Sequence, residues 1–200
     1  MIAALFVDPA GVYADLPQVE CWGIEQDARL YAGPHPVVAH PPCARWGRYW
    51  HGSPRKPHQY ALGDDAGCFE AALAAVRRWG GVLEHPAYSH AWLAHGLPWP
   101  GAGGGWQRDI EGGWCCHVEQ GHYGHASRKP TWLYAVGCKL PALRWEKGEQ
   151  RLDAALLARK GYVYARKCGI VGLSGGKEKK TEREATPPAF RDVLLGMVRT

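Results

Sequence analysis

Short apolar segments bounded by glycine, proline and polar residues predict a series of buried β-strands. Four of them come early, at residues 2–7, 19–25, 36–39 and 81–83. Between the third and the fourth, apolar residues recur every three or four positions from Ala66 to Trp79, which predicts an amphipathic helix. Asp64 and Asp65 can cap its first turn, and Gly80 can end it. Strand, helix and strand in this order form a βαβ unit, so the pattern predicts an α/β fold with a mostly parallel sheet.

The second half of the chain carries weaker patterns. Its strand candidates are residues 114–119 and 131–136, and its helix candidates are residues 89–95, 151–159 and 189–197. Two loops rich in Gly, Pro, Trp and Arg cover residues 44–63 and 96–113, and the polar stretch 120–130 reads as a connecting loop.

The length and composition indicate one main domain. Of the 200 residues, 46% are hydrophobic, which is enough for one sizeable core. We expect residues 1–145 to form the α/β domain and residues 146–200 to form a C-terminal helical extension packed on it, with a mobile charged linker at about 174–185. No apolar run approaches the roughly 20 residues of a membrane span, and the start has no basic leader. These features predict a cytoplasmic protein with no membrane partner.

The charge and the aromatic residues favour nucleic acid as a partner without establishing it. A net charge of +5 mildly favours a polyanion. Several of the ten tryptophans lie beside Gly, Pro or Arg and outside any apolar period, namely Trp46, Trp50, Trp99, Trp106 and Trp114. Such residues suit stacking on bases, and they equally suit the bracing of a fold with little regular structure.

Two motifs at strand ends carry the candidate chemistry. His40-Pro41-Pro42-Cys43 follows the third apolar run, and Glu84-His85-Pro86 follows the fourth. Open α/β sheets bind ligands at the carboxyl ends of neighbouring parallel strands. A thiol and a carboxylate at this edge are candidates for a nucleophile and an acid. The plain alternatives are a buried, inert Cys43 and a Glu84 that pairs with an arginine.

Cysteine and histidine also raise the possibility of zinc. His40 with Cys43 is one candidate group, and a second comprises Cys115, Cys116, His117, His122 and His125. Adjacent cysteines on a strand point to opposite faces, however, and no Cys-x-x-Cys pair occurs. We therefore predict no metal site, and we expect the seven cysteines to be mostly free thiols in a reducing compartment.

A third motif follows the two strand-end motifs in the sequence. Gln120-Gly121-His122-Tyr123-Gly124 is followed by Arg128-Lys129-Pro130-Thr131-Trp132-Leu133. Pro-Pro-Cys, a strand-borne Glu-x-Pro and this segment, in this order, resemble a compact, phage-type relative of the DNA cytosine-5 methyltransferases over roughly residues 1–137. The resemblance implies a Rossmann-like methyltransferase fold, S-adenosylmethionine as cofactor and DNA as partner. It also implies a bacterial or phage-infected host cell as the location.

The resemblance implies roles for the site residues. Cys43 would add to C6 of cytosine, Glu84 would protonate or hydrogen-bond N3 with a raised pKa, and Arg128 would hold O2 or a phosphate. His85 stands where the family has Asn, and it can still orient the neighbouring carboxylate. The residues expected to contact nucleic acid are Arg45, Trp46, Arg48, Gln120, Tyr123 and Lys129.

The cofactor half is shorter than in that family. The resemblance implies that S-adenosylmethionine would lie against Asp8, Gly11, Glu25, His40 and Pro41. The turn after the first strand has a single glycine, Gly11, where the family has a glycine-rich turn. The stretch from residue 8 to 19 is too short for a helix, and the stretch from 25 to 43 is too short for a helix and a strand. We therefore expect the usual third strand to be missing. A separate target-recognition domain has no room after residue 137.

The leading hypothesis is thus a DNA cytosine-5 methyltransferase-like enzyme that transfers a methyl group to a pyrimidine through a Cys43 adduct. The short cofactor half keeps two alternatives open. One is a pyrimidine-modifying enzyme that uses another donor or acts on a free nucleotide. The other is a non-catalytic nucleic-acid-binding relative. No obligate protein partner is evident from the sequence.

Overall fold

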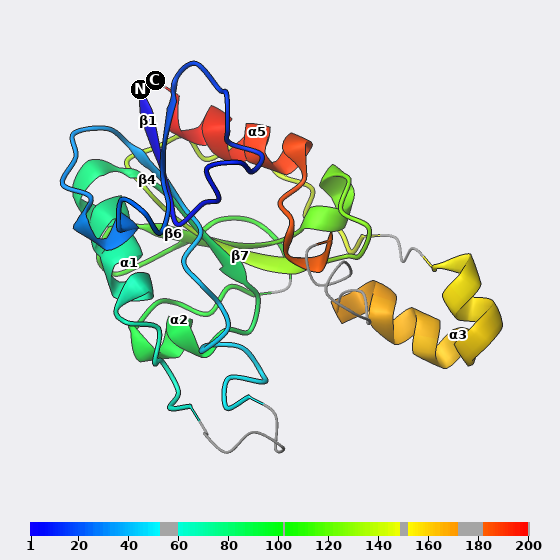
Figure 1. Cartoon of the computed structure of the whole chain (residues 1–200). Helices are drawn as coiled ribbons and strands as arrows, with labels where there is room; N and C mark the ends of the chain where they lie inside the picture. The colour runs from blue at the N-terminus through cyan, green and yellow to red at the C-terminus, as the bar shows by residue number, and fades with distance from the viewer. Residues whose placement is uncertain (53–59, 102, 149–151, 172–181, 200) are drawn as a thin grey trace.

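A seven-stranded sheet forms the centre of the protein. A computed structural model describes residues 1–52, 60–101, 103–148, 152–171 and 182–199 (Figure 1). The strands are β1 (Ile2–Leu5), β2 (Val19–Trp22), β3 (Val37–Ala39), β4 (Gly81–Pro86), β5 (Gln107–Arg108), β6 (Trp114–Glu119) and β7 (Pro130–Val136). Their order across the sheet is β2-β1-β3-β4-β7-β6-β5.

The sheet has a parallel half and an antiparallel half. β2, β1, β3 and β4 are parallel to one another, whereas β7 runs antiparallel to β4 and β6 antiparallel to β7. The expected α/β class is therefore confirmed, whereas the sheet, expected to be mostly parallel, is mixed, with three parallel and three antiparallel strand pairs among the described residues. The antiparallel part arises because η2 (Gln120–Tyr123) and the residues after it return the chain from β6 directly to its neighbour β7.

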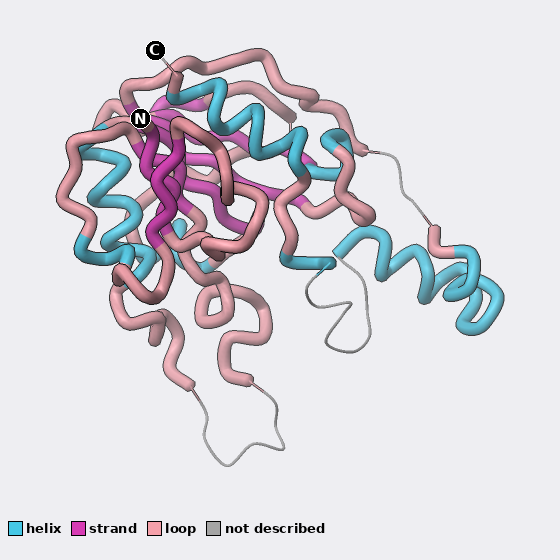
Figure 2. The backbone as a smooth tube through the Cα atoms, turned by 45° about the horizontal axis from the view of Figure 1, so that its top comes forward, coloured by secondary structure: helices cyan, strands magenta, loops and turns pink. Residues whose placement is uncertain are grey.

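Helices cover both faces of the sheet (Figures 1 and 2). On one face, α1 (Cys68–Trp79), α2 (His90–Ala94) and the short helix η1 (Ala28–Leu30) contribute to one buried cluster. On the other face, α5 (Pro188–Val198) packs through Phe190, Leu194, Leu195, Met197 and Val198. We call these the α1 face and the α5 face. Alternate residues of each strand feed the two clusters, as the pleat of a strand requires.

The start of α1 depends on Asp65. Its carboxylate accepts the backbone N–H groups of Gly67 and Phe69 at 3.0 and 2.9 Å, which would otherwise lack partners at the helix start. The same carboxylate accepts the indole N–H of Trp46 at 2.7 Å. The helix ends at Gly80, whose φ of 76° is readily adopted only by glycine. This agrees with the sequence analysis.

The C-terminal extension has two different parts. α3 (Ala154–Val171) changes direction at Gly161 and lies apart from the sheet, whereas α5 packs against it (Figure 1). The predicted mobile linker at 174–185 lies outside the described residues as far as residue 181, and residues 182–184 form one helical turn. None of the helices in the described part of the chain is long and apolar enough to cross a membrane.

Candidate functional site

The strand register brings the two strand-end motifs together. Ala39 pairs with Leu83, so His40 and Glu84 are the next residues on adjacent parallel strands. Val38 and Val82 pack on the α5 face, and residues two positions later on each strand share that face. His40 and Glu84 therefore project from the same edge and the same face of the sheet.

Five side chains form a continuous hydrogen-bonded chain at this edge, which we call the site network. The Tyr13 hydroxyl contacts His40 Nε2 at 2.8 Å, and His40 Nδ1 contacts Glu84 Oε2 at 2.9 Å. The amide nitrogen of Gln120 donates to Glu84 Oε1 and to the Thr131 hydroxyl, both at 2.9 Å. Both carboxylate oxygens of Glu84 are thus held by neutral or cationic donors.

The environment keeps Glu84 ionised. Burial alone would raise its pKa, but the hydrogen bond and charge of His40, together with Lys129 and His85, lower the pKa to about 2. This direction is opposite to the raised pKa that the acid role was expected to need. An ionised carboxylate only accepts hydrogen bonds, so His40 donates through Nδ1.

Cys43 lies beside this network in a half-buried position. Burial raises the pKa of its thiol, and the charges of Glu84 and Glu184 raise it further, while Lys129 lowers it. The thiol is therefore protonated at neutral pH, and it becomes a nucleophile only after losing its proton. The carbonyl of Cys43 accepts the N–H groups of Trp46 and Gly47, which fixes the turn that carries the thiol.

Lys129 brings a cation to the site from the start of β7. Its backbone has a φ of 42°, in the left-handed region that few non-glycine residues adopt. Its ammonium donates to the carbonyls of Glu184 and Ala185 at 3.1 and 2.7 Å. Burial lowers its pKa, while the charges of Glu84 and Cys43 raise it. Residues 184–185 thus pass over the site and hold its lysine.

Two other candidates lie in the interior. Arg128 forms a bidentate ion pair with Glu119, whose carboxylate also accepts the N–H of Gly148 at 2.9 Å. Trp46 is buried against Phe69 with its indole bonded to Asp65. Both residues have structural partners, and neither presents its side chain to a nucleic acid in this conformation.

His85 lies on the opposite face of β4 from Glu84. It is fully buried between Phe69 and Trp92, with ring centroids at 5.1 and 6.2 Å. Burial lowers its pKa to about 4, so the ring is neutral at neutral pH. The expectation that His85 orients the carboxylate is not met, because the side chain that bonds Glu84 is His40.

The residues expected to bind a cofactor lie after the ends of β1, β2 and β3. Asp8 and Gly11 form a self-bonded turn in which the Gly11 N–H donates to the Asp8 carbonyl at 2.9 Å. Glu25 is exposed beyond the end of β2, next to Ile24, which is 99% exposed. Pro41 is buried behind His40, and both ring nitrogens of His40 are already bonded. Of these candidates, Glu25 and the Asp8–Gly11 turn remain open to a ligand.

The remaining nucleic-acid candidates lie in the loop after β3 and in η2. The guanidinium of Arg45 stacks 3.2 Å from the centre of the Tyr60 ring, and Arg48 is exposed beside Tyr49. Tyr123 packs on Phe190 of α5, and its hydroxyl accepts the N–H of Arg144 at 3.2 Å. Of these residues, Arg48 is the most available to a partner.

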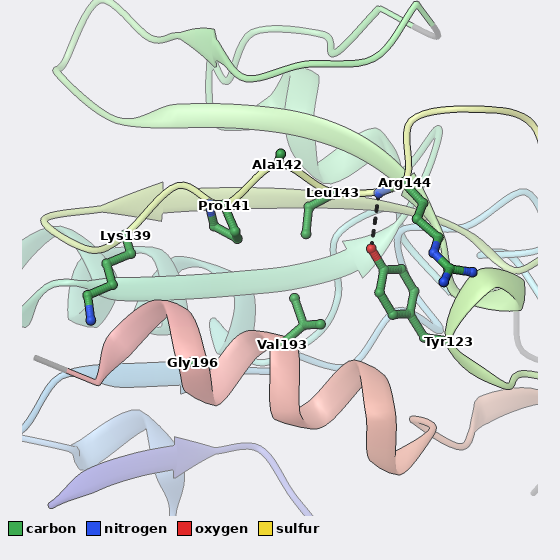
Figure 3. A pocket seen from close by; sticks show the side chains of 8 residues that line it. All are labelled: Tyr123, Lys139, Pro141, Ala142, Leu143, Arg144, Val193 and Gly196. Carbon is green, nitrogen blue, oxygen red and sulfur yellow. Dashed lines mark hydrogen bonds between the residues drawn. The ribbon is translucent and has the colours of Figure 1, made fainter.

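A hollow of about 460 Å³ lies between α5 and the chain after β7 (Figure 3). Its lining comprises Tyr123, Lys139, Pro141, Ala142, Leu143, Arg144, Val193 and Gly196. None of these residues belongs to the site network, and neither Cys43 nor Lys129 lines it. The hollow is therefore separate from the candidate chemistry.

In the part of the chain that the structure describes, no group of three or more His, Cys, Asp or Glu side chains could hold a metal ion. Cys115 packs on the α1 face and Cys116 on the α5 face, which confirms that the adjacent cysteines diverge. His125 is occupied by the backbone of Ser127 and Arg183.

Sequence reasoning missed two members of the site network, Tyr13 and Thr131. Thr131 stands within the Arg-Lys-Pro-Thr motif, and its alternation with Leu133 along β7 would have placed it on the α5 face. Tyr13 has no such signal, because it lies in a loop without periodicity.

Comparison with known proteins found no match to this chain among protein-family models, curated proteins or solved structures. The functional argument therefore depends on the site itself.

Proposed function

We propose that the protein is a DNA cytosine-5 methyltransferase-like enzyme, which transfers a methyl group from S-adenosylmethionine to a pyrimidine through a covalent Cys43 adduct. One observation carries the proposal. A thiol and a buried, hydrogen-bonded carboxylate lie together at the carboxyl ends of β3 and β4, close enough that the charge of Glu84 raises the pKa of Cys43. Packing alone does not require such a pair.

The strand order supports a Rossmann-like methyltransferase fold with one strand fewer than usual. β1 lies between β2 and β3, so the direction of strand progression changes at β1. Open α/β sheets bind their ligands at such a switch point, outside the carboxyl ends of the strands. His40 and the loop after β1 border this point, so a methyl donor and a base bound there would lie side by side.

The chemistry requires a nucleophile and a group that stabilises charge on the ring. As a thiolate, Cys43 forms a bond to C6 of the pyrimidine, and the displaced electron pair makes C5 nucleophilic. Glu84 acts at N3, where it stabilises the charge that develops on the ring. Solvent water takes the C5 proton, the C5–C6 double bond re-forms and Cys43 leaves as a thiolate, which restores the aromatic ring. When bound, S-adenosylmethionine supplies the electrophilic methyl group.

Two further groups support a pyrimidine with an exocyclic amine. Gln120 Oε1 is buried and has no hydrogen-bond partner among the described residues, so it can accept an N–H from such an amine. Lys129 can donate to a ring carbonyl if it exchanges its bonds to Glu184 and Ala185. Gln120 Oε1 as an acceptor for the amine and Lys129 as a donor to the carbonyl together match the edge of cytosine that carries both groups.

The residues at the donor site fit S-adenosylmethionine in part. An exposed carboxylate at the end of β2, Glu25, can accept hydrogen bonds from a ribose, and Ile24 offers an apolar surface beside it. His40, by contrast, has both ring nitrogens bonded within the site network and is not free for the cofactor.

Nucleoside mass spectrometry of DNA from cells that express the protein tests the proposal. We expect 5-methylcytosine with the unchanged chain, none with Cys43→Ala, and an unchanged level with the matched control Cys68→Ala. Cys68 is a half-buried cysteine at the start of α1, away from the site. The absence of any modified pyrimidine with the unchanged chain would refute the proposal.

A second candidate follows from the self-bonded turn after β1 and from the occupied ring of His40. The same Cys43 and Glu84 could act with another one-carbon donor or on a free nucleotide. Titration calorimetry separates the two. Micromolar binding of S-adenosylmethionine favours methyl transfer, and no heat at millimolar concentration favours the second candidate. If Cys43→Ser and Glu84→Gln leave the biological effect intact, a non-catalytic nucleic-acid-binding function replaces both.

A further inference from the structure

His40 is the central member of the site network, and the contact with S-adenosylmethionine that the resemblance implied for it does not explain its two hydrogen bonds. It follows β3 directly, and its N–H bond to the Leu5 carbonyl at 3.0 Å fixes its backbone. Its two ring nitrogens contact the Tyr13 hydroxyl and the Glu84 carboxylate at 2.8 and 2.9 Å. A histidine with both nitrogens bonded to titratable groups can take up and release a proton without turning.

The acid role of Glu84 needs a proton that its own carboxylate does not hold. Glu84 is ionised, and an ionised carboxylate offers no hydrogen to N3, which is itself an acceptor. The proton has to come from a neighbour in hydrogen-bond contact. His40 is the titratable side chain that donates to Glu84.

We propose that His40 and Glu84 share one proton and supply it to N3 of the pyrimidine, and that Tyr13 holds the imidazole in place for this transfer. This inference rests on the proposed function. His40 acts through Glu84 and does not touch the base, so it is a positioning residue that also stores the proton.

The proton balance closes within the pair. The transfer requires that His40 carries a proton on each ring nitrogen before reaction, while Glu84 is a carboxylate. Cys43 adds to C6 as a thiolate whose proton has gone to solvent water, and as it adds, the Nδ1 proton of His40 passes to Glu84 and Glu84 passes a proton to N3. His40 is then neutral, and its charge has moved to the base. When Cys43 leaves, N3 returns the proton and the pair regains its first state.

Tyr13 is not the source of the proton. Burial raises the pKa of Tyr13 well above its ordinary value, and the charge of Glu84 adds to this effect. The phenol therefore stays protonated. Its hydroxyl accepts from Nε2 when His40 is an imidazolium and also after the Nδ1 proton has passed to Glu84, because the neutral ring then keeps its Nε2 proton. Either way the ring keeps its orientation.

Other charged groups bias the pair from neighbouring elements. The titratable and charged groups that face its members are Lys129, His85 and Cys43 beside Glu84, and Arg191, Asp192 and Cys21 beside Tyr13; at neutral pH His85 and the Cys43 thiol are uncharged. Arg191 also bonds the Val12 carbonyl at 2.6 Å, which ties the Tyr13 loop to α5. The positive charge of Lys129 lowers the pKa of Glu84, so it favours transfer of the proton from Glu84 to N3.

The test measures single-turnover formation of the Cys43 adduct from pH 5 to 9. The probe is a pool of random-sequence duplexes containing 5-fluorocytosine, with S-adenosylmethionine present, because a C5 fluorine blocks the release of Cys43. Because the pKa of Cys43 is raised, we expect log rate to rise with pH as the thiolate population grows, and its slope to fall on the alkaline side as the pair loses its proton; we call this loss of slope the alkaline fall. In His40→Asn, which keeps a donor near the position of Nδ1 but cannot ionise, the alkaline fall should move down by about one pH unit or more.

Two further variants serve as controls. Glu84→Gln offers N3 an amide donor that does not titrate, so the alkaline fall should vanish, and adding His40→Asn should change nothing more. Tyr13→Phe should lower the rate and leave the position of the alkaline fall within about 0.5 pH units. The KM for DNA should stay the same in His40→Asn, because His40 does not touch the base.

The outcomes separate the inference from the proposed function. If the unchanged chain forms no adduct at any pH, the proposed function is refuted and the inference falls with it. If adducts form and His40→Asn keeps the alkaline fall of the unchanged chain, the inference alone is overturned. Nitrogen-15 shifts of the His40 ring give a readout that needs no activity. Their titration midpoint should change in Glu84→Gln, and an unchanged midpoint would also overturn the inference.

Discussion

Acid sensitivity should come in large part from one buried histidine. The ring of His85 is fully enclosed between Phe69 and Trp92, and burial lowers its pKa from 6.5 to about 4. In the unfolded chain the same ring takes up a proton as the pH falls through 6.5. Below that pH the unfolded state therefore binds more protons than the folded state, and the free energy of unfolding falls with the pH.

The structure gives a magnitude for this loss. The pKa falls by about 2.5, and each unit corresponds to about 1.36 kcal/mol, so the stability lost by pH 4 is about 3 kcal/mol. That is a large part of the 5–15 kcal/mol typical of a domain. The loss attributable to Glu84, whose pKa is lowered to about 2, falls in a more acidic window, between about pH 4.5 and 2.

The perturbation is His85→Leu, which replaces the ring with an apolar side chain of similar volume. At pH 7.5 we expect a stability within about 1.5 kcal/mol of the unchanged chain, since the substitution conserves volume. Between pH 7.5 and 4 the variant should lose about 3 kcal/mol less than the unchanged chain. Urea unfolding at four pH values, followed by tryptophan fluorescence, measures both losses.

A matched control is His90→Gln, at an exposed histidine in the first turn of α2. It should keep the full pH dependence of the unchanged chain. Parallel stability curves for His85→Leu and the unchanged chain would refute the reasoning, because they would show that His85 binds the same number of protons in both states.

Three further predictions concern Cys43, Arg128 and Asp65. Alkylation of Cys43 by iodoacetamide, followed by peptide mass spectrometry, should be slow at pH 8. It should be about threefold or more faster in Glu84→Gln, because that substitution removes a charge that raises the pKa of the thiol, and equal rates would contradict this. Arg128→Met should lower the free energy of unfolding by about 3–5 kcal/mol by leaving Glu119 buried and unpaired, and Glu119→Leu in the same chain should restore most of the loss in a urea titration. Asp65→Ala should cost about 1–2 kcal/mol in the same assay through the lost cap of α1, and Asp65→Asn should cost less.

The elements that the sequence predicted are those with local causes. β1, β3 and β4 are buried on both faces, which gives continuous apolar runs. α1 is buried on one face, which gives its three- and four-residue period. Asp65 and Gly80 act within a few residues of the helix ends that they define. β5, with two residues, and η1, with three, are too short to leave a period and were not predicted.

The site was predicted in part, because its contacts are not local. Cys43 and Glu84 were identified as strand-end residues that the parallel register brings to one edge. Tyr13 stands 27 positions before its partner His40, and Gln120 stands 36 positions after Glu84, so both bonds follow from the sheet order alone. The partners of Arg128 and Trp46 are likewise set by packing, and composition gave no sign of them.

The place of α5 in the chain has a consequence for how the protein folds during synthesis. Ile2, Val38 and Val82 lie under α5 on the same apolar face of the sheet, and α5 follows all seven strands in the sequence. A ribosome adding about 5–20 residues per second leaves that face uncovered for several seconds after β4 has emerged. Until α5 packs against it, this exposed apolar face makes the nascent chain prone to aggregate. We expect the nascent protein to depend on chaperones during that interval, and its yield to fall when translation slows between β7 and α5.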